Sequence, residues 1–83
     1  IDSIGWAYYL IDNYEQAEKY LKRAVELMPE DPVVNDHYGD ILWKLNRKIQ
    51  ARYFWNNVLS FDSTDEDIIN KINIKLIEGL QNS

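Results

Sequence analysis

The sequence contains no cysteine, only two prolines and three glycines among its 83 residues. Without cysteine, the chain can form neither a disulfide nor a thiolate metal site. No apolar run approaches the roughly 18 residues that a membrane-spanning helix needs, so we do not expect membrane insertion. The remaining composition, 46% hydrophobic and 28% charged residues, is typical of a soluble globular chain. The length fits one domain or a piece of one.

The chain begins at Ile1 and carries no basic, apolar leader. Either a leader was removed or this is an excised fragment whose targeting signals lie elsewhere, and we favour the fragment. The absence of cysteine is compatible with reducing and oxidising compartments alike. The compartment therefore stays open between the cytoplasm and, for an exported bacterial protein, the periplasm.

An internal repeat is visible when the sequence is shifted by 34 positions. This shift places Gly5 on Gly39 and Ala17 on Ala51. It also aligns large or apolar residues in four further pairs: Tyr8 with Leu42, Leu21 with Trp55, Ala24 with Val58, and Leu27 with Phe61. Small residues that recur in phase with large apolar ones are what two closely packed helices require. The period therefore predicts a repeated structural unit.

Apolar residues within each period follow one another at spacings of three and four, which predicts two helices per period. In the first period the two series are Ile1, Ile4, Tyr8 and Ile11, and then Tyr14, Ala17, Leu21, Ala24, Val25 and Met28. The break at Asp12-Asn13, matched by Asn46 in the second period, suits a tight turn that contains a left-handed residue. Pro29 closes the second helix, and Asp31-Pro32 begins the third with an N-cap and a proline at the first helical position.

A last amphipathic helix is predicted to end near Leu80. Ser63-Thr64-Asp65-Glu66 reads as a capping box, in which Ser63 caps the helix and Glu66 reaches back. The predicted apolar face consists of Ile68, Ile69, Ile72, Leu76 and Leu80, and the predicted solvent face of Asp67, Lys71, Lys75 and Glu78. The expected fold is therefore all-α, with about five helices.

The repeated positions resemble the tetratricopeptide repeat (TPR), a pattern of 34 residues. They are Gly5, Tyr8, Ala17, Leu21, Ala24 and Pro29, followed one period later by Gly39, Leu42, Ala51, Trp55 and Val58. The second period departs from the family at Asn35, Val58 and Ser63, where tryptophan, alanine and proline are usual. The resemblance covers Ile1 to Asp65. The stretches from Asp2 to Tyr9 and from Asp31 to Arg52 also look similar to bacterial members, which suggests a C-terminal fragment of a bacterial TPR protein.

The resemblance implies a right-handed superhelix of helix pairs, in which the first helix of each pair lines a concave groove. It implies repeats at residues 1–31 and 32–65, followed by a solvating helix and tail at 66–83. The aromatic residues, 13% of the chain, are expected mostly to pack in the core of this short array. We assign that role to Tyr8, Tyr14, Tyr20, Tyr38, Phe54, Trp55 and Phe61.

The family's ligand-contacting positions, transferred one by one, define a candidate peptide site. They fall on Asp2, Trp6, Tyr9 and Leu10 in the first repeat, and on Val33, Asp36, Asp40, Trp43 and Lys44 in the second. Trp6, Tyr9 and Trp43 are of the type enriched in binding hot spots, and the three aspartates would give a negative rim. We expect a partner peptide with apolar anchors and Lys or Arg. The alternative is that these aromatics pack against a neighbouring repeat.

Other functions receive less support from the sequence. Some family members clamp a chaperone's terminal carboxylate, but the matching positions here are Asp2, Trp6, His37, Asp67 and Lys71. Four of these five have the wrong chemistry and two have the wrong sign, so we do not expect this function. His37 lies near Asp36 and Asp40, yet no nucleophile or glycine-rich phosphate loop accompanies it, so we expect no catalysis, metal or cofactor. The basic residues Lys44, Arg47, Lys48 and Arg52 sit in a chain of net charge −5, which argues against nucleic-acid binding.

Self-association is the remaining possibility. The first repeat begins in mid-helix, so the apolar face that an earlier repeat would cover is open. Through this N-terminal face the chain could form a homo-oligomer, or it could meet a preceding repeat of its own parent.

Overall fold

The computed structural model describes residues 2–80 of the chain. Five helices follow one another: α1 (Asp2–Leu10), α2 (Tyr14–Leu27), α3 (Pro32–Lys44), α4 (Lys48–Leu59) and α5 (Glu66–Glu78). No β-strand occurs in this part of the chain, which confirms the predicted all-α fold of helical hairpins. Among residues 2–80 we also find no helix with the length and apolar character needed to cross a membrane.

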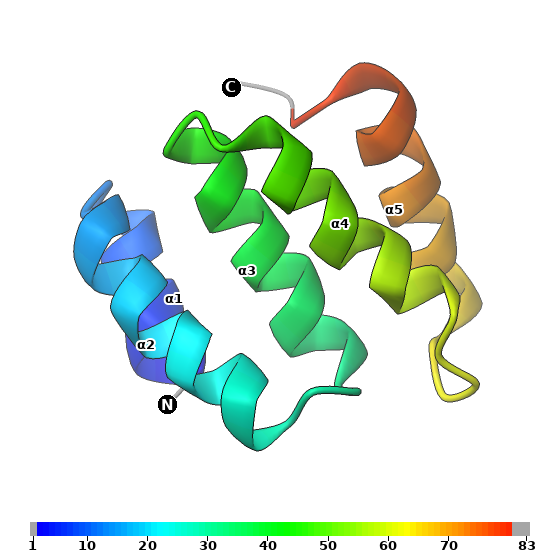
Figure 1. Cartoon of the computed structure of the whole chain (residues 1–83), viewed down its shortest axis with the longest axis horizontal. Coiled ribbons are helices and arrows are strands. Elements are labelled where there is room, and N and C mark those ends of the chain that lie inside the picture. Colours follow the sequence, from blue (N-terminus) through cyan, green and yellow to red (C-terminus); the bar gives the residue numbers. More distant parts are fainter. Residues whose placement is uncertain (1, 81–83) are drawn as a thin grey trace.

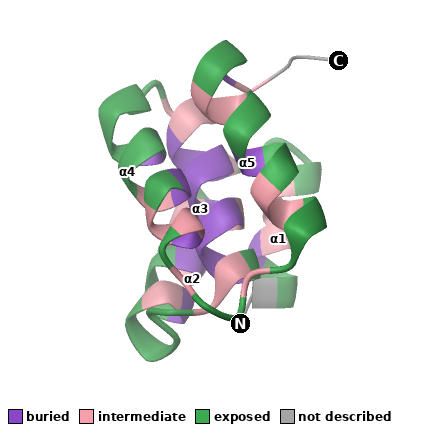
Figure 2. Ribbon diagram, turned by 90° about the vertical axis from the view of Figure 1, so that its right-hand side faces the viewer, coloured by how far each residue is buried: buried purple, intermediate pink, exposed green. Residues whose placement is uncertain are grey.

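Each helix packs against the next one in the chain, and α1 also touches α3. The hairpin of α1 and α2 lies at one end of the molecule, α4 and α5 lie at the other, and α3 runs between them (Figure 1). This central position makes α3 the most buried helix (Figure 2). Side chains of α3 can therefore meet partners from both ends of the molecule.

The period of the sequence reappears in the backbone. Asp12 and Asn46, which are 34 positions apart, have φ angles of 62° and 63° and end the first helix of each hairpin. Equivalent hydrogen bonds surround them: Asp12 N donates to Tyr9 O and Asn46 N to Trp43 O, while Asn13 N donates to Tyr8 O and Arg47 N to Leu42 O. The predicted tight turns are confirmed, with Asp12 rather than Asn13 as the left-handed residue.

The repeated glycines mark the closest approach within each hairpin. A Cβ atom on Gly5 would overlap the side chain of Leu21, and a Cβ atom on Gly39 would overlap the indole of Trp55. Both partners are fully buried and are themselves one period apart. Glycine is thus required at these two positions because a large residue of the second helix lies directly against the first.

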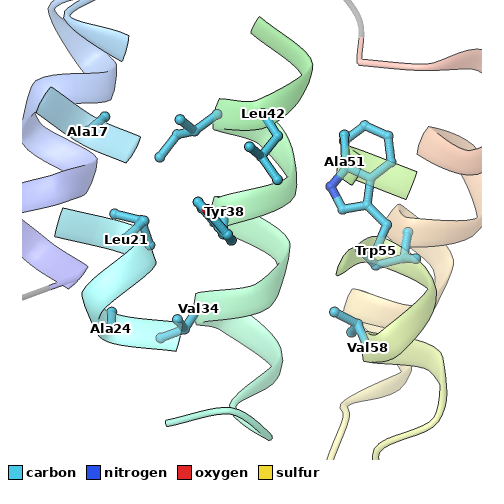
Figure 3. Close-up of a cluster of buried hydrophobic side chains, with 11 residues drawn as sticks. Ala17, Leu21, Ala24, Val34, Tyr38, Leu42, Ala51, Trp55 and Val58 are labelled. Carbon is cyan, nitrogen blue, oxygen red and sulfur yellow. The ribbon is translucent and has the colours of Figure 1, made fainter. Parts of the chain in front are cut away.

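The core consists mainly of three rows of side chains, one each on α2, α3 and α4 (Figure 3). They are Ala17, Leu21 and Ala24 of α2, Val34, Tyr38, Ile41 and Leu42 of α3, and Ala51, Trp55 and Val58 of α4, with Ile72 of α5 completing the cluster. The predicted core role of Tyr38 and Trp55 is confirmed, and Tyr8 and Phe54 pack against the same cluster. Tyr14, Tyr20 and Phe61 are half-buried.

The predicted start of α3 is confirmed, whereas the predicted start of α5 is wrong. Asp31 caps α3 by accepting a hydrogen bond from Val34 N at 3.0 Å, and Pro32 is the first helical residue. Helix α5 begins at Glu66 after Asp65, whose extended backbone occupies the N-cap position without a side-chain hydrogen bond. Ser63 therefore lies two residues outside the cap, too far away for a capping box.

Candidate functional site

Four aromatic rings of α1, α3 and the start of α2 form a ladder on one side of the molecule. The ring of Trp6 stacks between Tyr9, at a centroid distance of 4.4 Å, and His37, at 3.9 Å. Tyr14 continues the series at 5.5 Å from Tyr9 with tilted rings. We call these residues, Trp6, Tyr9, Tyr14 and His37, the aromatic ladder. Trp6, Tyr9 and His37 are half-buried, so each ring still offers some surface to solvent.

Beside the ladder lie Asp36 and Asp40, which one turn of α3 places on the same face. We call them the acidic pair. Their side chains are only 5% and 7% exposed, because Lys75 of α5 reaches across to them. The Lys75 Nζ lies 2.7 Å from Asp36 Oδ1, and 2.9 Å and 3.1 Å from the two Asp40 oxygens. Trp55 Nε1 also donates to Asp40 Oδ1, at 3.2 Å.

This arrangement corrects two expectations. The sequence predicts an open acidic rim at Asp36 and Asp40, but these carboxylates are buried. It also places Lys75 on the solvent face of the last helix, but the Lys75 side chain is only 12% exposed. The physical reason is common to both: two carboxylates can be enclosed only with a cation, and a long lysine stem can lie along apolar surface while its ammonium reaches them.

A second lysine of α5 stands further away. Lys71 Nζ lies 3.9 Å from Asp36 Oδ2, and the Lys71 side chain is 64% exposed. Helix α5 therefore directs two cations at the acidic pair, of which one is enclosed and the other is mostly in solvent.

The enclosed charges shift one another's pKa values. Burial raises the pKa of Asp40, and the positive charge of Lys75 offsets part of this rise. Burial by itself would lower the pKa of Lys75, but the charges of Asp40 and Asp36 outweigh it and raise that pKa. Burial, followed by the negative charge of Asp40, also raises the pKa of Tyr9. The ladder and the acidic pair are thus electrostatically coupled.

We expect the free energy of unfolding to fall as the pH rises above about 10. The pKa of Lys75 is raised above its ordinary 10.5, and those of Tyr9 and Tyr38 above their ordinary 10.0, Tyr38 through burial and its hydrogen bond to Glu18. A group whose pKa is higher in the folded protein than in the unfolded chain stabilises the fold at pH values below its pKa in the unfolded chain. This contribution disappears as the pH rises through its pKa in the folded protein. Urea titrations between pH values of about 8 and 11.5 test this.

Tyr38→Phe provides the control for this prediction, since it removes one of the three groups and should make the alkaline decline shallower. Constant stability of the parent chain up to a pH of about 11.5 would contradict the expected direction.

The remaining predicted site residues lie apart from the ladder. Leu10 and Val33 are exposed, and Lys44 is half-buried. Trp43 packs against Trp55 at 5.5 Å, and a Cβ atom on Gly79 would overlap its ring. Trp43 is therefore mainly held by α4 and the end of α5. The side chain of Asp2 lies outside the described residues.

Two ladder members are missed as binding residues by the sequence reasoning. It considers His37 only as a catalytic, metal or carboxylate-clamp residue, and it assigns Tyr14 to the core. The shift of 34 positions aligns His37 with Ser3, so the repeat gives no reason to pair His37 with Trp6. Among the residues that the structure describes, no group of three His, Cys, Asp or Glu side chains could hold a metal ion.

A separate apolar surface lies on α1 and the first residue after it, and we call it the α1 face (Ser3, Ile4, Ala7, Tyr8 and Ile11). These residues line an open hollow of about 450 Å³. Ile4 and Ile11 are 51% and 71% exposed, whereas Tyr38 and Leu42, which lie one period after Ile4 and Tyr8, are buried against the core. The α1 face is thus exposed, whereas the repeat-equivalent face of α3 is buried.

Comparison with known proteins agrees with this architecture. Residues 2–31, which span α1, α2 and the link to α3, match the family model of the tetratricopeptide repeat. This segment is similar to a TPR. No curated protein and no solved structure matches it significantly. The matched segment includes Gly5, Ala17 and Leu21, the residues that set the close packing of the first hairpin.

Proposed function

We propose that this chain is a non-catalytic interaction module that binds a peptide or helix of a partner protein on the aromatic ladder. In this proposal residues 1–31 and 32–65 are two TPRs, and residues 66–83 close the array. The observation that carries the proposal is the stack of Trp6 between Tyr9 and His37 on half-buried helix faces. The TPR match supports it, because repeats of this family commonly serve as protein-binding elements.

The physical properties of the ladder favour an apolar anchor on the partner. Aromatic rings offer large contact areas and lose little conformational entropy on binding, and stacking has already fixed their orientation here. An extended or helical segment with one or two large apolar side chains matches this surface.

A peptide-display selection against the purified chain tests the proposal. The parent should enrich peptides with large apolar residues, and Trp6→Ala should lose that enrichment, because it removes the ring that links Tyr9 to His37. Tyr53→Ala is the matched control, since Tyr53 is an exposed aromatic residue of α4. Circular dichroism must show that both variants remain helical. Equal enrichment by the parent and Trp6→Ala would refute the ladder as the binding surface.

A second function is favoured by the α1 face. We propose, as the alternative, that the chain is a structural segment of a longer helical array or associates with itself through this face. The buried state of the repeat-equivalent residues Tyr38 and Leu42 supports a helix as the covering element. Light scattering over a tenfold concentration range tests self-association: the mass should increase with concentration, and Ile4→Ser with Ile11→Ser should abolish the increase. A constant monomer mass would refute self-association.

A further inference from the structure

Helix α5 occupies the same place in the sequence period as α1 and α3. It begins at Glu66, one period after α3 begins at Pro32. Ile74 and Ile77 therefore stand two periods after Trp6 and Tyr9, the ladder residues of α1. The helix face that carries the aromatic ladder on α1 thus has an aliphatic counterpart on α5.

This counterpart is open to solvent. Ile74 and Ile77 are 52% and 82% exposed, whereas Ile72 of the same helix is fully buried in the core. An open hollow of about 190 Å³, which we call the α5 hollow, is lined by Lys71, Ile74, Lys75, Gly79 and Leu80. An apolar cavity of about 150 Å³ can hold benzene, so the α5 hollow has room for one large apolar side chain.

Contacts of α3 join the α5 hollow to the aromatic ladder. His37 of α3 stacks on Trp6 of α1 at 3.9 Å. The residue before it, Asp36, meets α5 through Lys75 at 2.7 Å and through Lys71 at 3.9 Å. Both lysines line the α5 hollow. The ladder, the acidic pair and the hollow therefore follow one another across α1, α3 and α5.

The charge that this surface offers to a partner is positive at its α5 end. Asp36 and Asp40 are only 5% and 7% exposed and are paired with Lys75, so neither carboxylate is open to a partner. Lys71, by contrast, is 64% exposed. An exposed ion pair contributes between nothing and about 1 kcal/mol, so Lys71 can exchange its long contact with Asp36 for a partner's carboxylate at little cost.

We propose that the partner segment continues from the aromatic ladder onto α5, where it places an apolar side chain in the α5 hollow against Ile74 and the carboxylate of an Asp or Glu on Lys71. This inference rests on the proposed function and adds a second subsite to it. It also reverses the charge of the partner that the sequence predicts. Ile77, one turn beyond Ile74, provides apolar surface for the same segment.

The test titrates the isotope-labelled chain with the capped dipeptide acetyl-Leu-Glu-amide, followed by NMR near neutral pH and at constant ionic strength. Saturable shifts of the amides of Lys71, Ile74 and Leu80 are expected. The neutral analogue acetyl-Leu-Gln-amide has nearly the same shape but no carboxylate, so it should bind about two- to fivefold more weakly.

Matched variants assign the two contacts. Lys71→Met keeps the apolar stem and should bind both dipeptides equally, whereas Lys22→Met, which removes an exposed lysine of α2, should keep the preference for the acidic one. Ile74→Ala should weaken both dipeptides about three- to tenfold. Ile49→Ala, which truncates an exposed isoleucine of α4, should leave their binding unchanged.

Three results would overturn the inference: no saturable shifts at Lys71 and Ile74, equal binding of the two dipeptides by the parent, or equal effects of Ile74→Ala and Ile49→Ala. Failure of the ladder is distinguishable, because Trp6 does not line the α5 hollow and Trp6→Ala should leave dipeptide binding unchanged. If only the dipeptide test fails, the ladder stands and the α5 subsite falls. Equal peptide-display enrichment by the parent and Trp6→Ala would instead refute the ladder, and with it the path of the segment.

Discussion

Replacing Lys75 with methionine is expected to lower the free energy of unfolding by about 3 to 5 kcal/mol, because both aspartates then remain buried without their enclosed cation. Methionine preserves much of the apolar stem, so the loss reports mainly the missing ammonium. The carboxylates cannot simply turn into solvent, since Asp40 also accepts a hydrogen bond from the buried Trp55. Urea denaturation near neutral pH, followed by circular dichroism, measures this loss.

Two control variants separate the ion pair from other effects of the substitution. Lys71→Met removes a charge from the same helix, but its ion pair is exposed, so it should cost no more than about 1 kcal/mol. The triple variant Lys75→Met, Asp36→Asn and Asp40→Asn removes all three charges and should recover much of the loss, since an uncharged replacement often equals a buried pair in stability. Equal losses for Lys71→Met and Lys75→Met would contradict the enclosed position of Lys75.

The pH dependence of Lys75→Met gives an independent check. Burial already raises the pKa of Asp40 above its ordinary 3.8, and loss of the nearby ammonium should raise it further. A carboxyl group whose pKa is higher in the folded protein than in the unfolded chain favours the fold at pH values below its pKa in the unfolded chain. This advantage is lost as the pH rises through its pKa in the folded protein. The deficit of the variant relative to the parent should therefore shrink as the pH falls from about 7 towards about 4.

The sequence predicted most of the fold because the relevant signals are local. The apolar spacing within α2 and α3, the Asp31-Pro32 start and the turns at Asp12 and Asn46 each depend on residues within one or two helical turns. Gly5 and Gly39 recur opposite large apolar residues, and this recurrence indicated the close packing of the two helices within each hairpin. Such features need no knowledge of how one hairpin lies against the next.

The site was harder to predict because it depends on contacts between hairpins. Lys75 directly precedes Leu76, at the border of the apolar face of α5, so spacing alone assigns it to solvent. Its position is explained only by Asp36 and Asp40, which lie more than thirty residues earlier in the sequence. A search for the cation that two aspartates on one face of α3 would require could have identified it. The stack of His37 on Trp6 likewise joins α1 to α3 and leaves no local pattern.

Trp55→Ala is the second substitution with a large expected effect, a loss of about 3 to 5 kcal/mol in the free energy of unfolding. Trp55 is fully buried and packs against Gly39 and Trp43. Alanine would leave a cavity and remove one of the hydrogen-bond donors to Asp40. A chain of this length is expected to have a total stability of only about 4 to 12 kcal/mol, so this loss is a large fraction of the total.

A substitution at Gly39 shows whether this loss reflects the specific fit between α3 and α4. In the parent, Gly39→Ala should be destabilising by about 1 to 3 kcal/mol, because its Cβ falls on the indole of Trp55. In the Trp55→Ala background the same change should be stabilising, since the space is vacant and alanine favours helix more than glycine does.

All four proteins would be compared in the same concentration of trimethylamine N-oxide, which keeps the weakest variant folded. Tyr53→Ala, an exposed change on the same helix, should shift stability by no more than about 0.5 kcal/mol. If Gly39→Ala had the same sign and size in both backgrounds, direct contact between Gly39 and Trp55 could not explain the repeated spacing of glycine and large residue that the two hairpins share.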